Sequence, residues 1–411
     1  MQRSFASENQ PTIWRKLATA ARKTFLDLEI SMNSGRVRFL IPIVLFAACQ
    51  CARYGANGSY LSLLLLQRPA SYNPVNQIQG GLITMSSAIT PVAVNSVDMS
   101  RSMVLCYFRT TQSDPASVPT CELTSSTQIV VQTGGSSVNY FAQWYLVEFA
   151  AGVVAQRGNT TFVPGDFSQS ITLPTAVDTA HSFVLLTSRM GSLNQTLDSE
   201  RTIRGVLSGP TTLTLSRNVA GTVNVDVHWQ VVQLSDTTVQ SGTLTIGAGS
   251  STSTAAISPV NLSKSFIFFN TRADAASGGF EEEYLVRASF ADSSTVSFSR
   301  GASNNTVDVS YFAVQMNDAS QVQAGSAATS SFAAPNTTTQ MTSALNAVNP
   351  NTTILAASSS VQNLGGGQQA DLDSGSWVPQ IVSPTLVQMD RGSSQDRFSQ
   401  VDYFAVQFVA Q

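Results

Sequence analysis

One short motif recurs four times along the chain and limits the folds that it can adopt. In each copy a β-branched or small residue precedes Gln, one variable residue and then Gly. The glycines are spaced by 77, 84 and 83 residues. A period this regular predicts one supersecondary unit that is used four times in series. The copies are Ile78-Gln79-Gly80-Gly81, Ala155-Gln156-Arg157-Gly158, Val239-Gln240-Ser241-Gly242 and Val322-Gln323-Ala324-Gly325.

A second signature, a strand-like run that begins with an aromatic residue, closes each unit. Three of these runs carry Gln four residues after the aromatic, and the first carries Glu148 there. Two inner runs end in a basic residue, although Ser360 replaces the first Arg in the fourth unit and Thr133 replaces the second in the first unit. The leading aromatics are Trp144, Trp229, Tyr311 and Tyr403, the Gln residues are Gln233, Gln315 and Gln407, and the Arg columns are Arg109, Arg189, Arg272 and Arg217, Arg300, Arg391.

The pattern inside the units predicts an all-β fold. Apolar and polar residues alternate with period two, and Val, Thr, Phe and Ile are frequent. Short strands between Ser, Gly, Asn and Asp clusters favour sandwiches or small barrels over β-α-β units. We therefore expect four tandem antiparallel β-sandwich modules after an N-terminal signal or anchor segment. With ~80 residues each, the modules should fold alone, whereas stacked solenoid repeats should not. The expected modules are 78–152, 153–236, 237–318 and 319–411.

The N-terminal region contains a short apolar run, Phe39 to Cys49, that follows two arginines. It is shorter than the ~20 residues of a transmembrane helix but fits the core of a signal peptide. The run ends Leu45-Phe46-Ala47-Ala48-Cys49, which resembles the lipobox of bacterial lipoproteins, although Phe46 stands where that pattern usually has an aliphatic residue. The resemblance implies cleavage before Cys49, a lipid on its sulfur and a membrane as partner. Residues 32–48 would be the signal peptide and 49–77 the lipidated N-terminus and linker.

Residues 1–31 are unusual for the start of a signal peptide because they are long and contain Asp27 and Glu29. They read as a basic amphipathic segment. If translation starts at Met32, this segment is an untranslated upstream extension and the signal peptide has ordinary proportions. If Met1 is the start, the basic helix stays in the cytoplasm beside a short anchor.

The composition fits an exported surface protein. Charged residues make up only 11% of the chain, and the net charge of −3 argues against nucleic acid as a partner. The units look like tandem modules of bacterial surface proteins, without pointing to a named family. This resemblance implies a place on the bacterial cell envelope or surface.

Two cysteines, Cys106 and Cys121, fall in consecutive expected strands of the first unit. In an oxidising compartment they can form a disulfide worth ~3 kcal/mol on the loop-entropy model. The alternative is a pair of buried thiols, because free cysteine is among the most buried residue types.

Catalytic and metal-binding patterns are missing from the sequence. The two histidines, His181 and His228, are not repeated between units, and no nucleophile elbow or His-Glu-x-x-His motif occurs. We therefore expect neither an enzyme nor a bound cofactor. Acidic loops could hold Ca²⁺, but their irregular spacing favours solvated loops. Their residues are Asp114, Asp198, Glu200, Glu281, Glu282, Glu283, Asp371 and Asp373.

The aromatic column allows two interpretations. Trp144, Trp229, Tyr311 and Tyr403 could stack on sugar rings, with the nearby Gln amides binding hydroxyls, or they could fill the core of each module. Three functions remain open on this basis. The first is a lipid-anchored structural or adhesive repeat array that gains avidity from repetition. The second is a carbohydrate-binding surface protein, and the third is an exported hydrolase.

Overall fold

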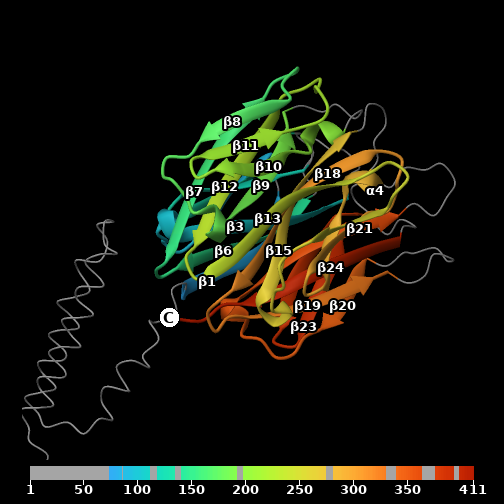
Figure 1. The fold of residues 1–411 in the computed structure, drawn as a ribbon. Coiled ribbons are helices and arrows are strands. Elements are labelled where there is room, and N and C mark those ends of the chain that lie inside the picture. The colour runs from blue at the N-terminus through green and yellow to red at the C-terminus, as the bar shows by residue number, and fades with distance from the viewer. Residues whose placement is uncertain are drawn as a thin grey trace, which may run out of the picture. The chain divides into compact units, whose positions relative to one another are not determined.

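The computed structural model describes residues 74–85, 87–111, 118–134, 140–191, 198–274, 281–329, 339–362, 375–392 and 398–411. The signal-peptide region, Cys49 and Cys51 lie outside these residues. The described chain is all-β, with small antiparallel sheets and a few single-turn helices (Figure 1). Ser71–Gln411 form one compact unit.

The strands fall into four consecutive segments of six. Segment 1 comprises β1 (Val75–Met85), β2 (Ile89–Ala93), β3 (Ser102–Thr110), β4 (Thr120–Ser125), β5 (Gln128–Gln132) and β6 (Tyr140–Phe149). Segment 2 comprises β7 (Val153–Phe162), β8 (Ser168–Thr172), β9 (Ser182–Met190), β10 (Arg204–Gly209), β11 (Thr212–Ser216) and β12 (Val225–Leu234). Segment 3 comprises β13 (Thr237–Ile246), β14 (Thr252–Ala256), β15 (Ser265–Asp274), β16 (Arg287–Asp292), β17 (Thr295–Ser299) and β18 (Thr306–Met316). Segment 4 comprises β19 (Gln321–Ala328), β20 (Gln340–Ala344), β21 (Thr353–Gln362), β22 (Trp377–Ser383), β23 (Leu386–Arg391) and β24 (Phe398–Gln407).

Each segment contains the same two three-stranded sheets. In the first sheet the closing strand lies between the opening and the third strand, as in β1-β6-β3. In the second sheet the fifth strand lies between the second and the fourth, as in β2-β5-β4. Because the opening and closing strands pair, residues at the two ends of a segment become neighbours. The repeated Gln-x-Gly motif therefore lies directly beside the repeated aromatic strand.

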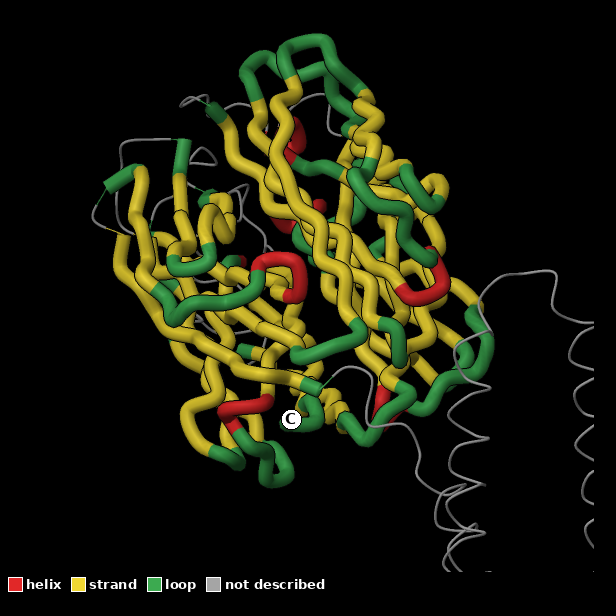
Figure 2. The backbone as a smooth tube through the Cα atoms, turned by 90° about the vertical axis from the view of Figure 1, so that its left-hand side faces the viewer, coloured by secondary structure: helices red, strands yellow, loops and turns green. Residues whose placement is uncertain are grey.

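Short helices join the second and third strands, and Figure 2 shows them as red turns at the ends of strands. They are η1 (Met99–Arg101), η3 (Thr179–His181), η5 (Leu262–Lys264) and η6 (Pro350–Thr352). Two further turns, η4 (Asp198–Arg201) and α4 (Glu281–Tyr284), precede the fourth strand of segments 2 and 3. The helices η1, η3, η5 and η6 matter for the arrangement of the segments, because each of them contacts the opening strand of another segment.

The four segments are connected in a cycle. β7 contacts η1, β13 contacts η3 and β19 contacts η5, and β1 of segment 1 contacts η6 of segment 4 in the same way. We call these contacts the first, second, third and closure junctions. At the closure junction the Val75 N–H donates to Val409 O at 2.9 Å, and Gln411 N–H donates to Val75 O at 3.1 Å. In Figure 1 the blue start of the described chain and its red end accordingly meet.

The hydrophobic core runs across the segment boundaries. One cluster of buried side chains takes members from all four segments, while two smaller clusters lie within segments 1 and 4. The rings of Phe183 and Phe268, from segments 2 and 3, lie 5.0 Å apart. The rings of Phe149 and Phe408 meet edge to face at 5.4 Å where segment 1 contacts segment 4. Each segment therefore buries part of its apolar surface within itself and part against the neighbouring segments.

Candidate functional site

The four aromatic residues of the closing strands are buried, with exposed fractions of 1–7%. Each lies directly opposite the glycine of a Gln-x-Gly motif on the paired opening strand, as Trp229 lies opposite Gly158. A Cβ on Gly158 would come within 2.6 Å of the Trp229 ring, and a Cβ on Gly325 would collide with Tyr403. In segments 2 to 4 the ring thus occupies the space that a side chain would need, which explains why this position is glycine, whereas a Cβ on Gly81 would lie in ordinary contact with Trp144. The burial favours the interpretation of these aromatics as core residues. The four pairs are Gly81 and Trp144, Gly158 and Trp229, Gly242 and Tyr311, and Gly325 and Tyr403.

The glutamine of each motif binds the backbone after the second strand with both ends of its amide. Gln156 Nε2 donates to Thr175 O at 2.7 Å, and its Oε1 accepts from Thr175 N at 2.8 Å. The other three glutamines make the same pair of bonds to Asn95, Ser258 and Asn346. The amide therefore acts like one residue of a β-ladder and fixes the crossover between the two sheets. These glutamines are Gln79, Gln156, Gln240 and Gln323.

The Gln amides of the closing strands also have backbone partners. Gln233 Oε1 accepts from Asp178 N at 2.8 Å, and Gln315 and Gln407 do the same with Asn261 and Asn349. Glu148 takes this role in segment 1. The residue that donates this backbone N–H is itself the N-cap of a short helix, and a Ser or Thr four residues later donates to its carbonyl. The capping pairs are Asp98 and Ser102, Asp178 and Ser182, Asn261 and Ser265, and Asn349 and Thr353.

The last residue of each short helix belongs to the junction with the next segment. The Arg101 guanidinium donates to Ala150 O, and the Lys264 ammonium donates to Asp318 O. His181 Nδ1 lies 2.5 Å from Thr237 O. A basic side chain thus holds the connection between segments at the first three junctions. At the closure junction the corresponding residue is Thr352, whose carbonyl accepts from Phe408 N.

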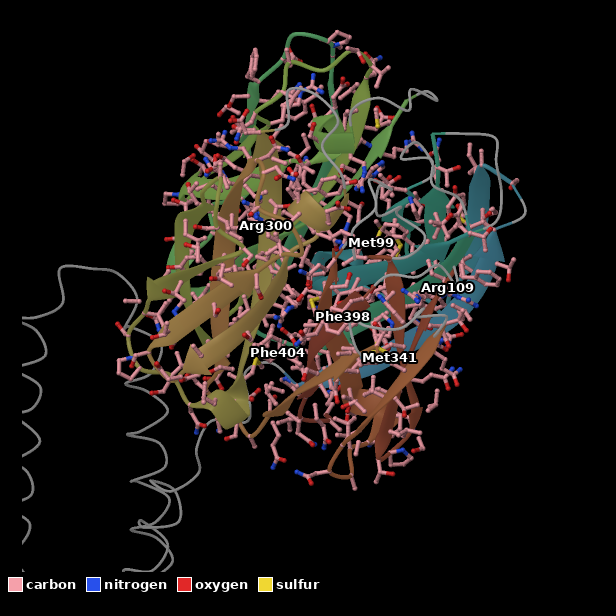
Figure 3. All side chains as sticks on the ribbon, turned by 90° about the vertical axis from the view of Figure 1, so that its right-hand side faces the viewer. Met99, Arg109, Arg300, Met341, Phe398 and Phe404 are labelled. Carbon is pink, nitrogen blue, oxygen red and sulfur yellow. A yellow bond between two sulfur atoms is a disulfide. The ribbon has the colours of Figure 1, made fainter. Side chains whose placement is uncertain are left out.

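The arginine columns serve structural contacts. Arg217 is 1% exposed and donates to the carbonyls of Asp166, Val163 and Ala220. Arg300, labelled in Figure 3, holds the corresponding loop through Gly247 and Ser250 carbonyls. In the other column Arg189 and Arg272 pair with Asp226 and Asp308 on the closing strands. Arg109 lies over the Phe141 ring and donates to Arg391 O of segment 4.

The acidic loops are only partly described. Asp114, Asp371 and Asp373 lie outside the described residues, as do the side chains of Asp198 and Glu281. Glu200 accepts from Thr222 N and Oγ1, and Glu283 accepts from the amides of Asn304 and Asn305. Within the described ranges no group of three or more His, Cys, Asp or Glu side chains could hold a metal ion. Calcium binding stays a prediction for the loops that the structure does not describe.

A disulfide joins Cys106 on β3 to Cys121 on β4, with their Cα atoms 6.3 Å apart. It connects the two sheets of segment 1 at the side that faces the other segments. The two histidines lie far from each other along the chain and serve different junctions. His181 belongs to the second junction, and His228 to the first.

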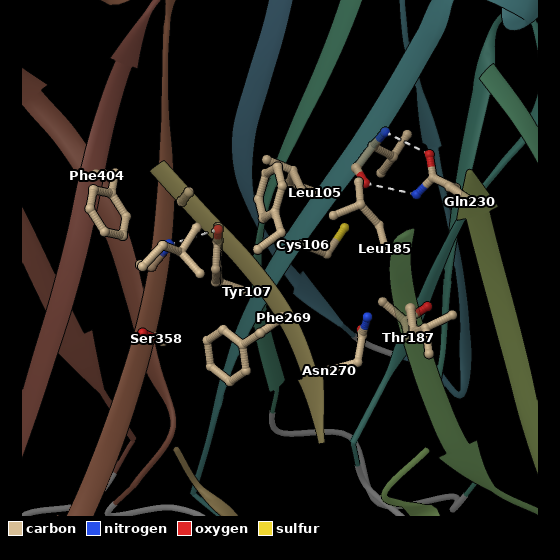
Figure 4. Close-up of a pocket in the computed structure, with 16 residues that line it drawn as sticks. Leu105, Cys106, Tyr107, Leu185, Thr187, Gln230, Phe269, Asn270, Ser358 and Phe404 are labelled. Carbon is tan, nitrogen blue, oxygen red and sulfur yellow. Dashed lines mark hydrogen bonds between the residues drawn. The ribbon is translucent and has the colours of Figure 1, made fainter. Parts of the chain in front are cut away.

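A cavity of about 220 Å³ lies where the third strands of all four segments converge (Figure 4). The Tyr107 hydroxyl donates to Leu355 O at 2.8 Å and accepts from Ala357 N at 3.0 Å, so it joins segments 1 and 4. Burial raises the pKa of Tyr107 to about 12. Gln230 makes a two-ended bond to the backbone of Val104 across the first junction. The walls are otherwise mostly apolar, which is typical of a packed centre.

The first junction contains a partly buried cluster of polar and charged side chains. His228 Nδ1 lies 2.9 Å from Glu122 Oε2, and the pKa of Glu122 is lowered chiefly by this hydrogen bond. Arg157 Nη2 donates to Ser102 O at 2.5 Å. Burial lowers the pKa of Arg157 to about 10, although the charge of Glu122 opposes this shift. The Glu122 carboxylate thus interacts with both His228 and Arg157 where β4, β7 and β12 meet.

The closure junction instead contains an open groove of about 550 Å³. Its walls come from β1 and β6 of segment 1 and from η6, β21 and β22 of segment 4. A second hollow of about 520 Å³ shares Ile78 and Asn351 with it. All residues that line the groove are uncharged. We call this feature the closure groove and regard it as the candidate binding site of the described chain.

Neither protein-family models nor curated proteins match the sequence. Among the described residues no helix is long and apolar enough to cross a membrane.

Proposed function

We propose that the four segments are β-sandwich modules of a single closed head, which a lipid on Cys49 attaches to the bacterial cell envelope. The head serves a structural or adhesive role at the surface. The N-terminal anchor rests on the lipobox-like sequence before Cys49. The modular interpretation is supported by the identical strand order of the four segments.

The observation that carries the proposal is the closure of the cycle. The backbone bonds between Val75 and the C-terminal residues bring the two ends of the described head together. An anchor that precedes residue 74 would therefore carry one closed domain and not a string of independent modules. A rigid head of this kind presents a constant surface to a partner, since its segments are packed through a shared core.

The repeated positions support a role other than catalysis. Repeated Gln, Gly, aromatic and capping residues contact one another or backbone groups. The repetition is therefore explained by the needs of the fold. Adhesion would depend on features that differ between the segments. We therefore do not expect four equal binding sites that act by avidity.

Cell fractionation tests the display. Cys49→Ser should release the protein from the membrane fraction and leave the N-terminus without the mass of a lipid, because the thiol is the attachment point. Cys51→Ser, two residues away, is the matched control and should stay membrane-bound. A wild-type chain with an unprocessed N-terminus, or equal release of both variants, would contradict the anchor.

A further inference from the structure

The closure groove differs from the first junction at the residues that define it. On β1 the variable residue of the Gln-x-Gly motif is Gly80, and its counterpart at the first junction is Arg157. Arg157 reaches Ser102 O of the preceding segment. The counterpart of Ser102 in segment 4 is Thr353, which lines the groove. The groove therefore occupies the place that an arginine side chain fills at the first junction.

The charged partners of that arginine are also replaced. Glu122 on β4 corresponds to Gln380 on β22, and His228 on β12 corresponds to Gln143 on β6. Both glutamines line the groove. The first junction thus holds three charged or titratable side chains where the closure junction holds one glycine and two neutral amides. A charged ligand would enter this groove without a compensating charge, which is costly in a partly buried site.

One of these amides is incompletely satisfied. Gln143 is 5% exposed, and its Nε2 donates to Trp144 O at 3.3 Å, but its Oε1 has no hydrogen-bond partner among the described residues. Turning the amide over would leave the other end without a partner instead. At the second and third junctions the same position is paired, because Ser310 donates to Gly205 O and Asp402 pairs with Arg287. At the first junction His228 Nδ1 lies within ion-pair distance, 2.9 Å, of Glu122 Oε2. A buried polar atom without a partner costs free energy that a ligand can recover.

We propose that the closure groove binds an uncharged saccharide. A sugar hydroxyl can donate to Gln143 Oε1, and the same hydroxyl can accept from a neighbouring amide. Leu82, which is 41% exposed, and Ile381 supply aliphatic surface for the C–H face of the ring. The volume of about 550 Å³ is within the ordinary range for small-ligand sites. An extended peptide is less suited, because η6 and Ala410 already contact the β1 strand to which it would have to pair.

The inference rests on the proposed adhesive role only for its biological use. Binding of a sugar is measured in solution, while membrane attachment is measured by fractionation with Cys49→Ser. Either result can therefore fail while the other holds.

Saturation-transfer NMR with the full-length protein tests the site. The probes are glucose, galactose, mannose, N-acetylglucosamine and N-acetylgalactosamine, with arginine and a blocked neutral pentapeptide as comparison ligands. We expect transfer to at least one sugar. Gly80→Arg, which restores the side chain that segment 2 carries, should weaken its affinity by about tenfold or more.

Two further variants make the result decisive. Ser241→Arg places the same side chain at the corresponding exposed position of segment 3 and should leave the affinity within about twofold. Gln143→Leu removes the unpaired acceptor while keeping a similar side-chain volume, and it should reduce sugar binding. This variant tests the site independently if Gly80→Arg does not fold. Transfer to none of the sugars, preference for arginine or the peptide, or unchanged sugar affinity in folded Gly80→Arg or Gln143→Leu would overturn the proposal.

Discussion

Gly158 on β7 lies directly opposite Trp229 on β12, and the indole ring covers the glycine. The residue without a side chain on one strand thus faces a large aromatic side chain on the paired strand. The same relation recurs between Gly242 and Tyr311 and between Gly325 and Tyr403. Two signatures that lie some 70 residues apart in the sequence are therefore one structural feature.

The first prediction concerns this close approach. Gly158→Ala should destabilise the head by about 1–3 kcal/mol, because the new methyl group forces the Trp229 ring to move within a packed core. Urea denaturation followed by circular dichroism measures the change. Gly209→Ala on β10 is the matched control, since a Cβ there meets no atom within 4 Å. Equal stability of both variants would contradict the account of the motif.

The second prediction separates a core role from a ligand role for the aromatic column. Trp229→Ala should lower the free energy of unfolding by about 3–5 kcal/mol, because it leaves a cavity in place of an indole ring that is only 5% exposed. Thermal melting of the full chain measures the loss. If Trp229 were a sugar contact, the melting temperature would stay nearly constant and only sugar binding would fall.

The third prediction concerns pH. The hydrogen bond from His228 holds the folded-state pKa of Glu122 below its ordinary value of 4.5. A lowered carboxyl pKa stabilises the fold fully above the unfolded-state value, and this stability is lost as the pH falls through the lower folded-state value. Glu122→Gln should therefore reduce the stability near neutral pH and flatten its fall below about pH 4.5.

Denaturation midpoints measured across the acid range test this prediction. Asp274→Asn is a suitable control, because Asp274 is an exposed carboxylate at the end of β15, far along the chain from this junction. The prediction fails if the acid limb of Glu122→Gln superimposes on that of the wild type.

Much of the fold could be predicted from local patterns, because strand alternation and the repeated motifs depend on neighbours in the sequence. The cyclic arrangement could not, since it depends on Val75 pairing with residues at the far end of the chain. The groove was missed although its signal is present: Gly80 stands where the second copy of the motif has Arg157. The repeated cap, as in Asp98 and Ser102, was likewise visible as Asp or Asn followed four residues later by Ser or Thr. The bonds of the motif glutamines have no such signal, because their partners are backbone groups.

The last prediction tests the closed cycle by moving the chain ends. At the first junction only the residues between Phe149 and Val153 connect the closing strand β6 to the opening strand β7. A similarly short linker should therefore be able to join Gln411 to Pro74. New termini placed between Leu234 and Thr237, at the second junction, would then leave all described strands intact. We expect this circular permutant to fold with a β-type spectrum and a cooperative melt, since exposed connections tolerate such cuts. A permutant opened within β12 should not fold, because that strand is the centre of its sheet. If the permutant opened at the second junction also fails to fold, the contact between segments 1 and 4 is not the equivalent of the other three.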